Sequence, residues 1–346
     1  MSSLVADRME LLMPYTVTSA FQTFQSHYVD LEKGDVDRAR TSRNFLEGQL
    51  TNLPGKVANF PPLYGSFMYF GSFSRKTKIR PLDDIDLMLL LDGKNTSVVH
   101  WSGYTYLLRI TDQNSPLWQY RNDGDYYLNS TKVLNKIKSS LSQVQYYRNS
   151  DVKRNGVAVV LDLTSYPWVF DIVPAFPVDN GLGGVAHYLI PDGNGKWMRT
   201  DPRIDQATIT IANQTHNGNL LPLMRIMKYW NTHHYATRKL SSYYLETLLI
   251  TAFRYYPAIT SLRLGKLTAF QQLATLVMGS CPDPKGLGPN LDASVPWETK
   301  VKVQEQANQM AQNARYALNY EQQSNDAEAV KWWKFIFYPD FPTYGP

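Results

Sequence analysis

The stretch YFGSFSRKTKIRPLDDIDLMLLLDG, at residues 69–93, constrains this chain more than any other part of its sequence. The apolar run at 87–91 is typical of a buried strand. Asp84 and Asp86 lie at the start of that strand, and residues two apart on a strand point to the same side. The two carboxylates are therefore held close together, and because like charges repel, we expect a cation between them.

The residues before this strand suit a phosphate group. Gly71 and Ser72 follow a short apolar run at 66–70 that predicts a strand. Gly71 permits a close approach of the backbone, and Ser72 is expected to start a helix whose free N–H groups favour an anion. Paired carboxylates suit Mg²⁺, which prefers oxygen ligands and often shares substrate phosphates. The stretch therefore predicts a site for Mg²⁺ and phosphate.

A third carboxylate nearby would allow two metal ions to be held, which together activate an attacking hydroxyl and steady a leaving pyrophosphate. Two residues are candidates, Asp162 in VVLDLTS and Asp171 in VFDIVPAFP. They lie on apolar runs at 157–163 and 168–173, which flank a turn signal and predict a hairpin. The residues alone leave the choice between them open.

The periodicity along the chain predicts an α+β fold. Apolar spacing predicts two helices within 15–53, broken near Gly34-Asp35, and another helix within 123–148. Short apolar runs predict the strands of a mixed sheet; they lie at 66–70, 87–91, 104–110, 157–163 and 168–173.

The pattern changes towards the C-terminus. The helical period dominates from about residue 219 to the end, and Gly/Pro-rich loops are expected at 179–203 and 282–296. We therefore predict two domains. The first, 1–215, is an N-terminal helix plus the mixed sheet, and the second, 216–346, is a helical domain.

Composition sets broad limits on location and ligands. The net charge of +5 suits an anionic ligand without requiring one. Cys281 is the one cysteine, so no disulfide forms within the chain, and this favours a reducing compartment. No long apolar run or signal peptide is recognisable, so we expect a cytoplasmic protein with no membrane span.

The Gly-Ser pair, eleven residues, and then Asp-hydrophobic-Asp resemble the signature of the DNA polymerase β-like nucleotidyltransferase superfamily. The fuller string, with Arg75, Thr77, Arg80 and Pro81, is similar to the bacterial CD-NTases, relatives of cyclic GMP-AMP synthase and oligoadenylate synthetase. This resemblance covers most of residues 15–342. It implies a polymerase β-like mixed sheet, the nucleotidyltransferase catalytic core, within 1–215. It also implies that the C-terminal helical domain at 216–346 is like that of oligoadenylate synthetase and completes the nucleotide pocket.

The resemblance also implies roles for the carboxylates. Asp171 matches the family's third aspartate, which is followed by hydrophobic-Val-Pro-Ala, and Asp162 is then a neighbour on the adjacent hairpin strand. Asp84, Asp86 and Asp171 are accordingly expected to be catalytic and to hold two Mg²⁺ or Mn²⁺ ions.

Nucleotide-binding roles follow from further matches. Gly71, Ser72 and Arg75 belong to the opening motif. Lys228, in LLPLMRIMKYWN, resembles a lysine that contacts the donor triphosphate. Ser242 and Tyr243, in KLSSYYLETLLI, resemble a serine that binds a phosphate and a tyrosine that stacks on the base.

The function implied is the joining of ribonucleoside triphosphates into a cyclic di- or trinucleotide second messenger in anti-phage (CBASS) defence. One alternative is a template-independent RNA or tRNA nucleotidyltransferase, or an oligoadenylate synthetase-like polymerase that makes linear products. A long nucleic acid substrate would favour a larger basic excess than this chain has. Another alternative, a nucleotide-binding module with a dead site, is disfavoured by the complete motif.

The expected partners are nucleoside triphosphates as substrates, and regulatory proteins or a downstream effector of the same defence operon. The bases used, the linkage and the activating signal stay open.

Overall fold

The computed structural model describes residues 15–65, 67–233 and 240–345. The helical segments before residue 150 are α2 (Val17–Phe24), a π-helical turn (Gln25–Val29), α3 (Lys33–Thr51), α4 (Leu53–Lys56), α5 (Gly71–Ser74) and α6 (Ser130–Leu141), with 3₁₀ turns at Trp118–Tyr120 and Gln145–Tyr147. The later helices are α7 (Pro202–Thr215), α8 (Leu220–His233), α9 (Ser242–Phe253), α10 (Leu262–Leu276), α11 (Trp297–Gln322) and α12 (Asp326–Ile336). The strands are β1 (Met68–Tyr69), β2 (Asp84–Leu90), β3 (Thr96–Ser102), β4 (Thr105–Ile110), β5 (Asp151–Asn155), β6 (Ala158–Asp162), β7 (Val169–Asp179), β8 (Val185–Pro191) and β9 (Trp197–Thr200).

Strand β7 is the centre of the mixed sheet. The strand order is β1-β2-β7-β8-β9-β4-β3, and β6 pairs with both β5 and β7. The first half of β7 runs parallel to β2 and antiparallel to β6, whereas its second half pairs with β8. A strand with neighbours on both sides is expected to be apolar, and most of the side chains of β7 are buried.

The two faces of the sheet are covered differently. Leu87 and Leu89 of β2 share a core with Leu46 and Leu50 of α3 and with apolar residues of α6. The alternate residues of β2, such as Met88, belong to a much smaller cluster on the other face. Side chains alternate between the two faces along a strand, so Asp84 and Asp86 lie on the same, less covered face as Met88.

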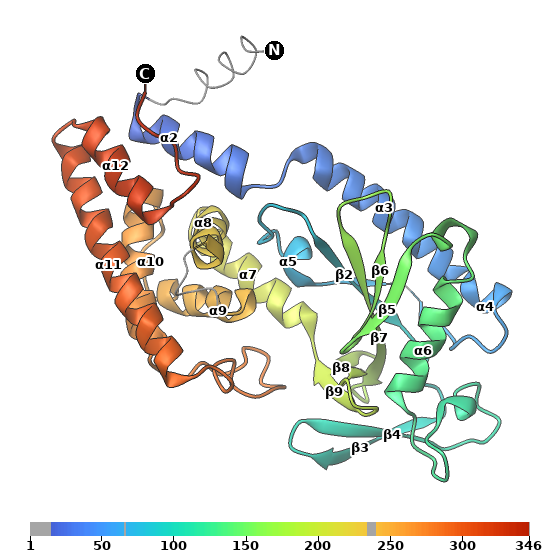
Figure 1. The fold of residues 1–346 in the computed structure, drawn as a ribbon. Coiled ribbons are helices and arrows are strands. Elements are labelled where there is room, and N and C mark those ends of the chain that lie inside the picture. The colour runs from blue at the N-terminus through green and yellow to red at the C-terminus, as the bar shows by residue number, and fades with distance from the viewer. Residues whose placement is uncertain (1–14, 66, 234–239, 346) are drawn as a thin grey trace.

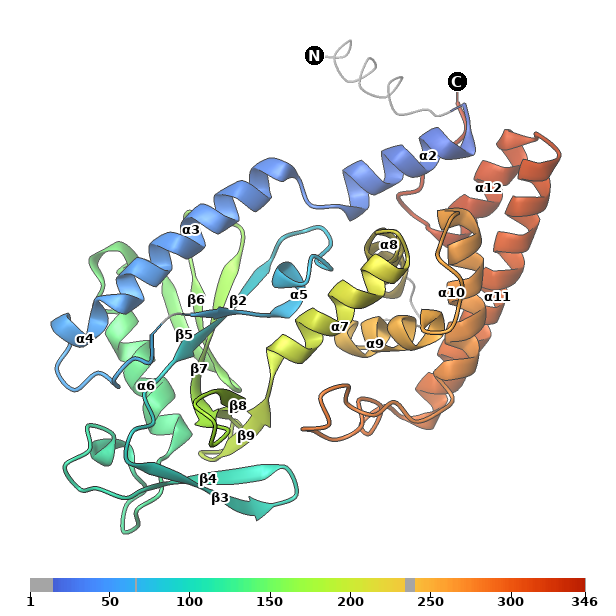
Figure 2. The same cartoon turned by 180° about the vertical axis from the view of Figure 1, so that it is seen from behind.

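The helical half of the chain has its own core, which includes both ends of the described chain. Phe21 and Phe24 of α2 pack on Phe337 and Phe341 at the C-terminal end of the chain, with ring centroids 4.8–6.0 Å apart. Figures 1 and 2 show α2 lying along the helical half and α3 along the sheet. The N-terminal segment thus spans both halves. No helix in the described ranges is long and apolar enough to cross a membrane.

The structure confirms most of the predicted strands and corrects several boundaries. β2, β4, β6 and β7 lie on the predicted runs; Ser66, the first residue of the run at 66–70, lies outside the described residues. The first two helices are separated at 30–32, and Gly34 lies inside α3. The helix predicted within 123–148 is shorter, at Ser130–Leu141.

Strands β3 and β5 lie where no strand was expected, and two further segments were predicted wrongly. The segment 179–203, expected as a loop, contains β8 and β9, because its glycines form the tight turns of a β-meander. Helix formation begins at Pro202 rather than near 219. Asp201 caps α7 by accepting a hydrogen bond from the Arg203 N–H (3.1 Å), and Pro202 occupies the first turn.

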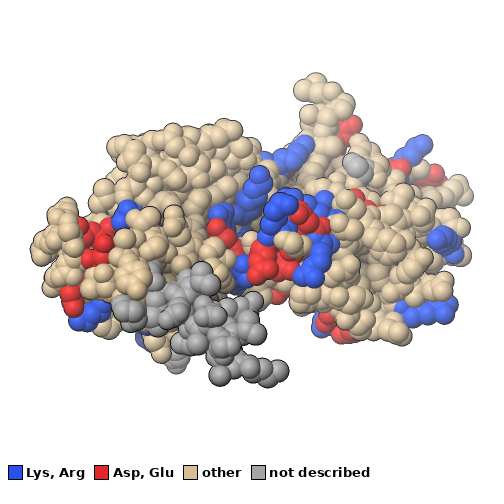
Figure 3. Space-filling model, turned by 90° about the horizontal axis from the view of Figure 1, so that it is seen from above, with Lys and Arg blue, Asp and Glu red and all other residues tan. Residues whose placement is uncertain are grey.

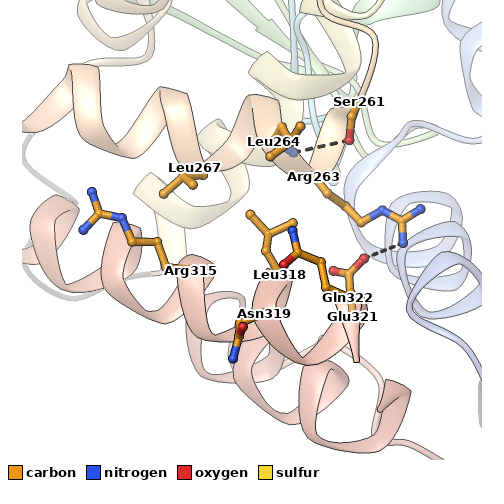
Figure 4. A pocket seen from close by; sticks show the side chains of 9 residues that line it. All are labelled: Ser261, Arg263, Leu264, Leu267, Arg315, Leu318, Asn319, Glu321 and Gln322. Carbon is orange, nitrogen blue, oxygen red and sulfur yellow. Dashed lines mark hydrogen bonds and ion pairs between the residues drawn. The ribbon is translucent and has the colours of Figure 1, made fainter. Parts of the chain in front are cut away.

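Charged side chains of both signs lie side by side on the face shown in Figure 3. Helix α3, which runs along that side of the molecule, carries the ion pairs Lys33–Asp37 and Arg40–Asp37. A cavity of about 550 Å³ lies elsewhere, between α10 and α11, with the Arg263–Glu321 ion pair (2.7 Å) at its wall (Figure 4). None of the predicted site residues lines it.

Lys266 of α10 is a buried cation in this helical core. Its ammonium lies 3.8 Å from the centroid of the Phe21 ring and donates a hydrogen bond to the Leu262 carbonyl (3.2 Å). Burial lowers the pKa of Lys266 from 10.5 to about 7, with a smaller contribution from Arg263. The folded state therefore disfavours the charge that the unfolded chain carries at neutral pH.

We predict that Lys266→Met stabilises the protein by about 2–4 kcal/mol at pH 6, because it removes the burial of a charge. Since the folded-state pKa is lowered, the unfolded state binds more protons between about 7 and 10.5, and Lys266 makes stability rise with pH in that window. The gain from the substitution should shrink towards pH 10.5. Urea unfolding at several pH values measures it, with exposed Lys302→Met as the control.

Candidate active site

Parallel pairing of β2 and β7 brings the predicted carboxylates together. Asp86 is the direct register partner of Asp171, and Asp84 lies opposite Val169, two residues along. Neighbouring strands are about 4.8 Å apart, so the side chains of Asp86 and Asp171 are adjacent on the same face. Asp162, the alternative third carboxylate, lies on β6 opposite Val169 and is exposed.

The charges of this carboxylate cluster oppose one another. Burial, followed by the charges of Asp84 and Asp171, raises the pKa of Asp86 from 3.8 to about 7. Burial and the charge of Asp84 also raise the pKa of Asp171. Lys78 counteracts the shift at both residues, and Arg75 does so at Asp86. The cluster is thus a place where additional positive charge is favoured.

Gly71 lies directly against the Asp86 carboxylate. Its φ is +72°, and a Cβ placed there would lie 1.6 Å from Asp86 Oδ2, so only glycine fits. Gly71 begins α5, a single turn, and the Ser72 carbonyl accepts hydrogen bonds from the N–H groups of Thr77 (2.9 Å) and Lys78 (3.1 Å). The opening motif is therefore folded tightly onto the carboxylates, and its predicted contact with a phosphate stays a prediction.

Three carboxylates on neighbouring strands, with the Gly71 backbone directly against one of them, are a donor set suited to Mg²⁺ or Mn²⁺, which prefer oxygen ligands. As the side chains lie, no three His, Cys, Asp or Glu groups in the described parts of the chain form a ready metal-binding set. The Lys78 ammonium instead lies 2.5 Å from Asp84 Oδ1 and also contacts Asp83. Although burial lowers it, these hydrogen bonds give Lys78 a net raised pKa.

A buried ionic network lies next to the cluster. Glu246 of α9 accepts a hydrogen bond from Lys228 through Oε1 (2.8 Å) and from Arg75 through Oε2 (3.0 Å). Lys228, which is only 4% exposed, also donates to the Thr77 carbonyl (2.8 Å). The network connects α8 and α9 to the turn that follows Ser72. In this structure the Lys228 ammonium is hydrogen-bonded to Glu246 and to the Thr77 carbonyl. Its predicted contact with a triphosphate stays a prediction.

Sequence reasoning missed Glu246. The residue is a single carboxylate within the apolar run YYLETLLI, and a charge buried in such a run normally has a partner. This signal was present in the sequence, but nothing in it identified Lys228 and Arg75 as the partners.

Tyr243 is surrounded by charged groups. Its hydroxyl donates to Asp205 Oδ1 (2.6 Å) and accepts from Lys285 (2.6 Å). The Lys285 ammonium is 4.4 Å and the Arg75 guanidinium 5.5 Å from the ring centroid. Asp205 and Lys285 were not predicted from the sequence.

Ser242 is the first residue of α9 and is exposed, whereas the preceding Ser241 caps the helix by accepting from the Tyr244 N–H (3.2 Å). The Ser242 hydroxyl therefore lies at a helix start, where a phosphate is favoured. Its predicted role is compatible with this position and stays a prediction.

Comparisons with known proteins give a consistent result. No protein-family model matches the chain. A probable cyclic nucleotide synthase of Bacillus cereus (strain VD146) is 39% identical over 334 residues, which are 96% of this chain and 99% of the relative. Cyclic AMP-AMP-AMP synthase of an Acinetobacter species is 26% identical over 222 residues, which are 61% of this chain and 60% of the relative.

Two solved structures of CdnC from E. coli MS115-1 resemble this fold. The structure with ATP has a TM-score of 0.68 and 15% identity, covering 93% of this chain and 98% of CdnC. The complex with HORMA-deltaN has a TM-score of 0.66 at the same identity, covering 93% of this chain and 97% of CdnC. These likenesses confirm the predicted α+β fold with a mixed sheet and a C-terminal helical region.

Removing the charge of Asp86 should stabilise the metal-free protein. Because the folded-state pKa is raised, the folded state binds more protons between about 3.8 and 7, and stability falls as pH rises through that window. We expect Asp86→Asn to gain about 1–2 kcal/mol at pH 8 and little at pH 4, less than the full shift because the side chain is partly exposed. Thermal unfolding measures this, and the exposed Asp162→Asn is the control. Equal effects of Asp86→Asn at both pH values would contradict the assignment.

The Lys228 side chain should stabilise the fold before any nucleotide binds, because it pairs with the buried Glu246 carboxylate. Lys228→Met leaves a buried carboxylate with half of its partners, and we expect a loss of about 2–3 kcal/mol of stability. The surface pair of Lys331 with Glu328 offers a control, since Lys331→Met should cost less than about 1 kcal/mol. Urea unfolding of both variants measures this. Unchanged stability of Lys228→Met would contradict this structural role.

Proposed function

The chain belongs to the bacterial CD-NTases, the cyclic nucleotide synthases, and from that premise we propose that it joins ribonucleoside triphosphates into a cyclic di- or trinucleotide at the Asp84–Asp86–Asp171 cluster. The family membership rests on the relative that is 39% identical over nearly the whole of both chains. The proposed location of the active site rests on the register of β2 and β7, which places Asp86 beside Asp171, and on Gly71, which lies against Asp86.

The three carboxylates would hold two Mg²⁺ or Mn²⁺ ions. When bound, the ions supply activation of an attacking hydroxyl and neutralise charge on the leaving pyrophosphate. Asp171 is adjacent to Asp86 and partly buried, and burial raises its pKa. A carboxylate with a raised pKa is a better proton acceptor, so we assign Asp171 the role of orienting the acceptor hydroxyl and taking its proton.

The donor nucleotide would lie between the Gly71–Ser72 turn and the start of α9. Arg75 is the cation that faces both regions, since it acts on Asp86 and lies over the Tyr243 ring. Tyr243 would stack on the donor base once Lys285 leaves that ring, an interaction worth roughly 1–3 kcal/mol. Ser242, at the exposed start of α9, would bind a phosphate.

A small acceptor fits this chain better than a long polymer. The net charge is only +5, and the face seen in Figure 3 carries acidic and basic side chains together rather than one basic surface. Binding a nucleic acid strand relies on many phosphate contacts with Lys and Arg. We therefore favour a nucleotide acceptor and a cyclic product over the linear products of a polymerase.

We also propose a setting for the reaction. CdnC, the structural neighbour, has been solved with ATP and in a complex with HORMA-deltaN, which supports nucleotide substrates and a regulatory protein for this chain as well. A downstream effector of the same anti-phage defence operon would receive the product. The single cysteine is compatible with a cytoplasmic location.

The product can be tested with purified protein, Mg²⁺ or Mn²⁺, and the four ribonucleoside triphosphates, each α-³²P-labelled in turn. We expect a small product whose label survives phosphatase, because a cyclic compound has no terminal phosphate. Asp86→Asn and Asp171→Asn should each reduce product formation at least a hundredfold while leaving the protein folded, and Asp162→Asn should retain activity. A ladder of long products, or transfer only to added RNA, would overturn the cyclic product in favour of a polymerase.

A further inference from the structure

Lys78 occupies an unusual position between two different environments. On one side its ammonium pairs with Asp83 and Asp84 at the edge of the carboxylate cluster. Lys78 also lines a cavity of about 510 Å³ together with Arg40, Arg43 and Arg225. Only 12% of the Lys78 side chain is exposed, so its charge is placed by these neighbours rather than by solvent.

We propose that the ammonium of Lys78 is a resident counter-ion of the carboxylate cluster, and that an incoming divalent ion must displace this ammonium from Asp84. This inference rests on the proposed metal site. The ammonium and a metal ion would compete for the same oxygen, because Lys78 lies 2.5 Å from Asp84 Oδ1. Two cations at such a short separation repel strongly. The affinity of the enzyme for its metal is therefore set partly by how firmly Lys78 is held.

Asp83 is where the displaced ammonium would go. It already contacts Lys78, and its side chain is 63% exposed, so it remains available when a metal takes Asp84. Movement of the Lys78 ammonium into the cavity that Lys78 lines is unfavourable, because other cations line that cavity. Its one carboxylate, Asp30, is already paired with Arg225 (2.7 Å). Lys78 would therefore keep its contact with Asp83 and lose its contact with Asp84 when a metal ion binds.

The counter-ion has a use while no metal is bound. Asp84, Asp86 and Asp171 are held together by strand pairing whether or not a cation is present. Lys78 offsets their repulsion, and its exchange for a divalent ion keeps positive charge at the cluster throughout. Removing Lys78 should therefore weaken the metal-free fold and strengthen metal binding, two effects of opposite sign.

Mn²⁺ binding to the full chain without nucleotide tests this directly, with the free-ion signal followed by electron paramagnetic resonance. We expect Lys78→Met to lower the Mn²⁺ dissociation constant about tenfold and to lower the melting temperature of the metal-free protein. Asp83→Asn should raise the dissociation constant about threefold, since Lys78 then has Asp84 alone. Lys33→Met, which removes an exposed lysine paired with Asp37 on the surface (3.2 Å), is the matched control and should change neither value.

Equal or weaker Mn²⁺ binding by Lys78→Met would overturn the counter-ion role. If that variant does not fold, Asp83→Asn decides alone, and unchanged binding there overturns the role as well. Asp86→Asn separates this inference from the proposed function. Loss of binding in Asp86→Asn with wild-type affinity in Lys78→Met refutes only the counter-ion, whereas full binding in Asp86→Asn refutes the metal site itself.

Discussion

Three carboxylates on two paired strands repel one another, and the packing around them must hold them together against this repulsion. Parallel pairing of β2 with β7 fixes Asp86 beside Asp171, and Asp84 lies one pleat away. Burial, together with the charges of Asp84 and Asp171, raises the pKa of Asp86 to about 7, so the fold disfavours the ionised form on which metal binding would depend. Such an arrangement persists only because the surrounding core over-determines it.

Two features supply that support. Behind the carboxylates, β2 and β7 bury alternate residues such as Leu87 and Phe170 in one core with α3 and α6, so the strands cannot separate to relieve the repulsion. At the front, Lys78 lies against Asp84, and Gly71 approaches Asp86 more closely than any residue with a Cβ could. The site is thus held by apolar burial on one face and by charge and backbone shape on the other.

The sequence predicted what is local and missed what depends on long-range pairing. The 69–93 stretch identified β2 and its two aspartates, because both follow from spacing along one strand. The choice of Asp171 over Asp162 needed a family resemblance, since no residue pattern reveals that β7 pairs with β2. Strands β8 and β9 were missed because short apolar runs between glycines also describe a loop, whereas the Asp201-Pro202 cap of α7 was a signal that could have been used.

Glu246 shows why the nucleotide-binding side was harder to predict than the carboxylates. Lys228 and Arg75 looked like free cations because their sequence neighbours offer them no acid, yet both converge on one carboxylate in α9. One negative charge shared by two cations leaves a net positive charge, so the network still favours an anion nearby. The same carboxylate joins α8 and α9 to the turn after Gly71, so one buried network links the predicted nucleotide-binding residues of the helical half to the sheet that carries the carboxylates.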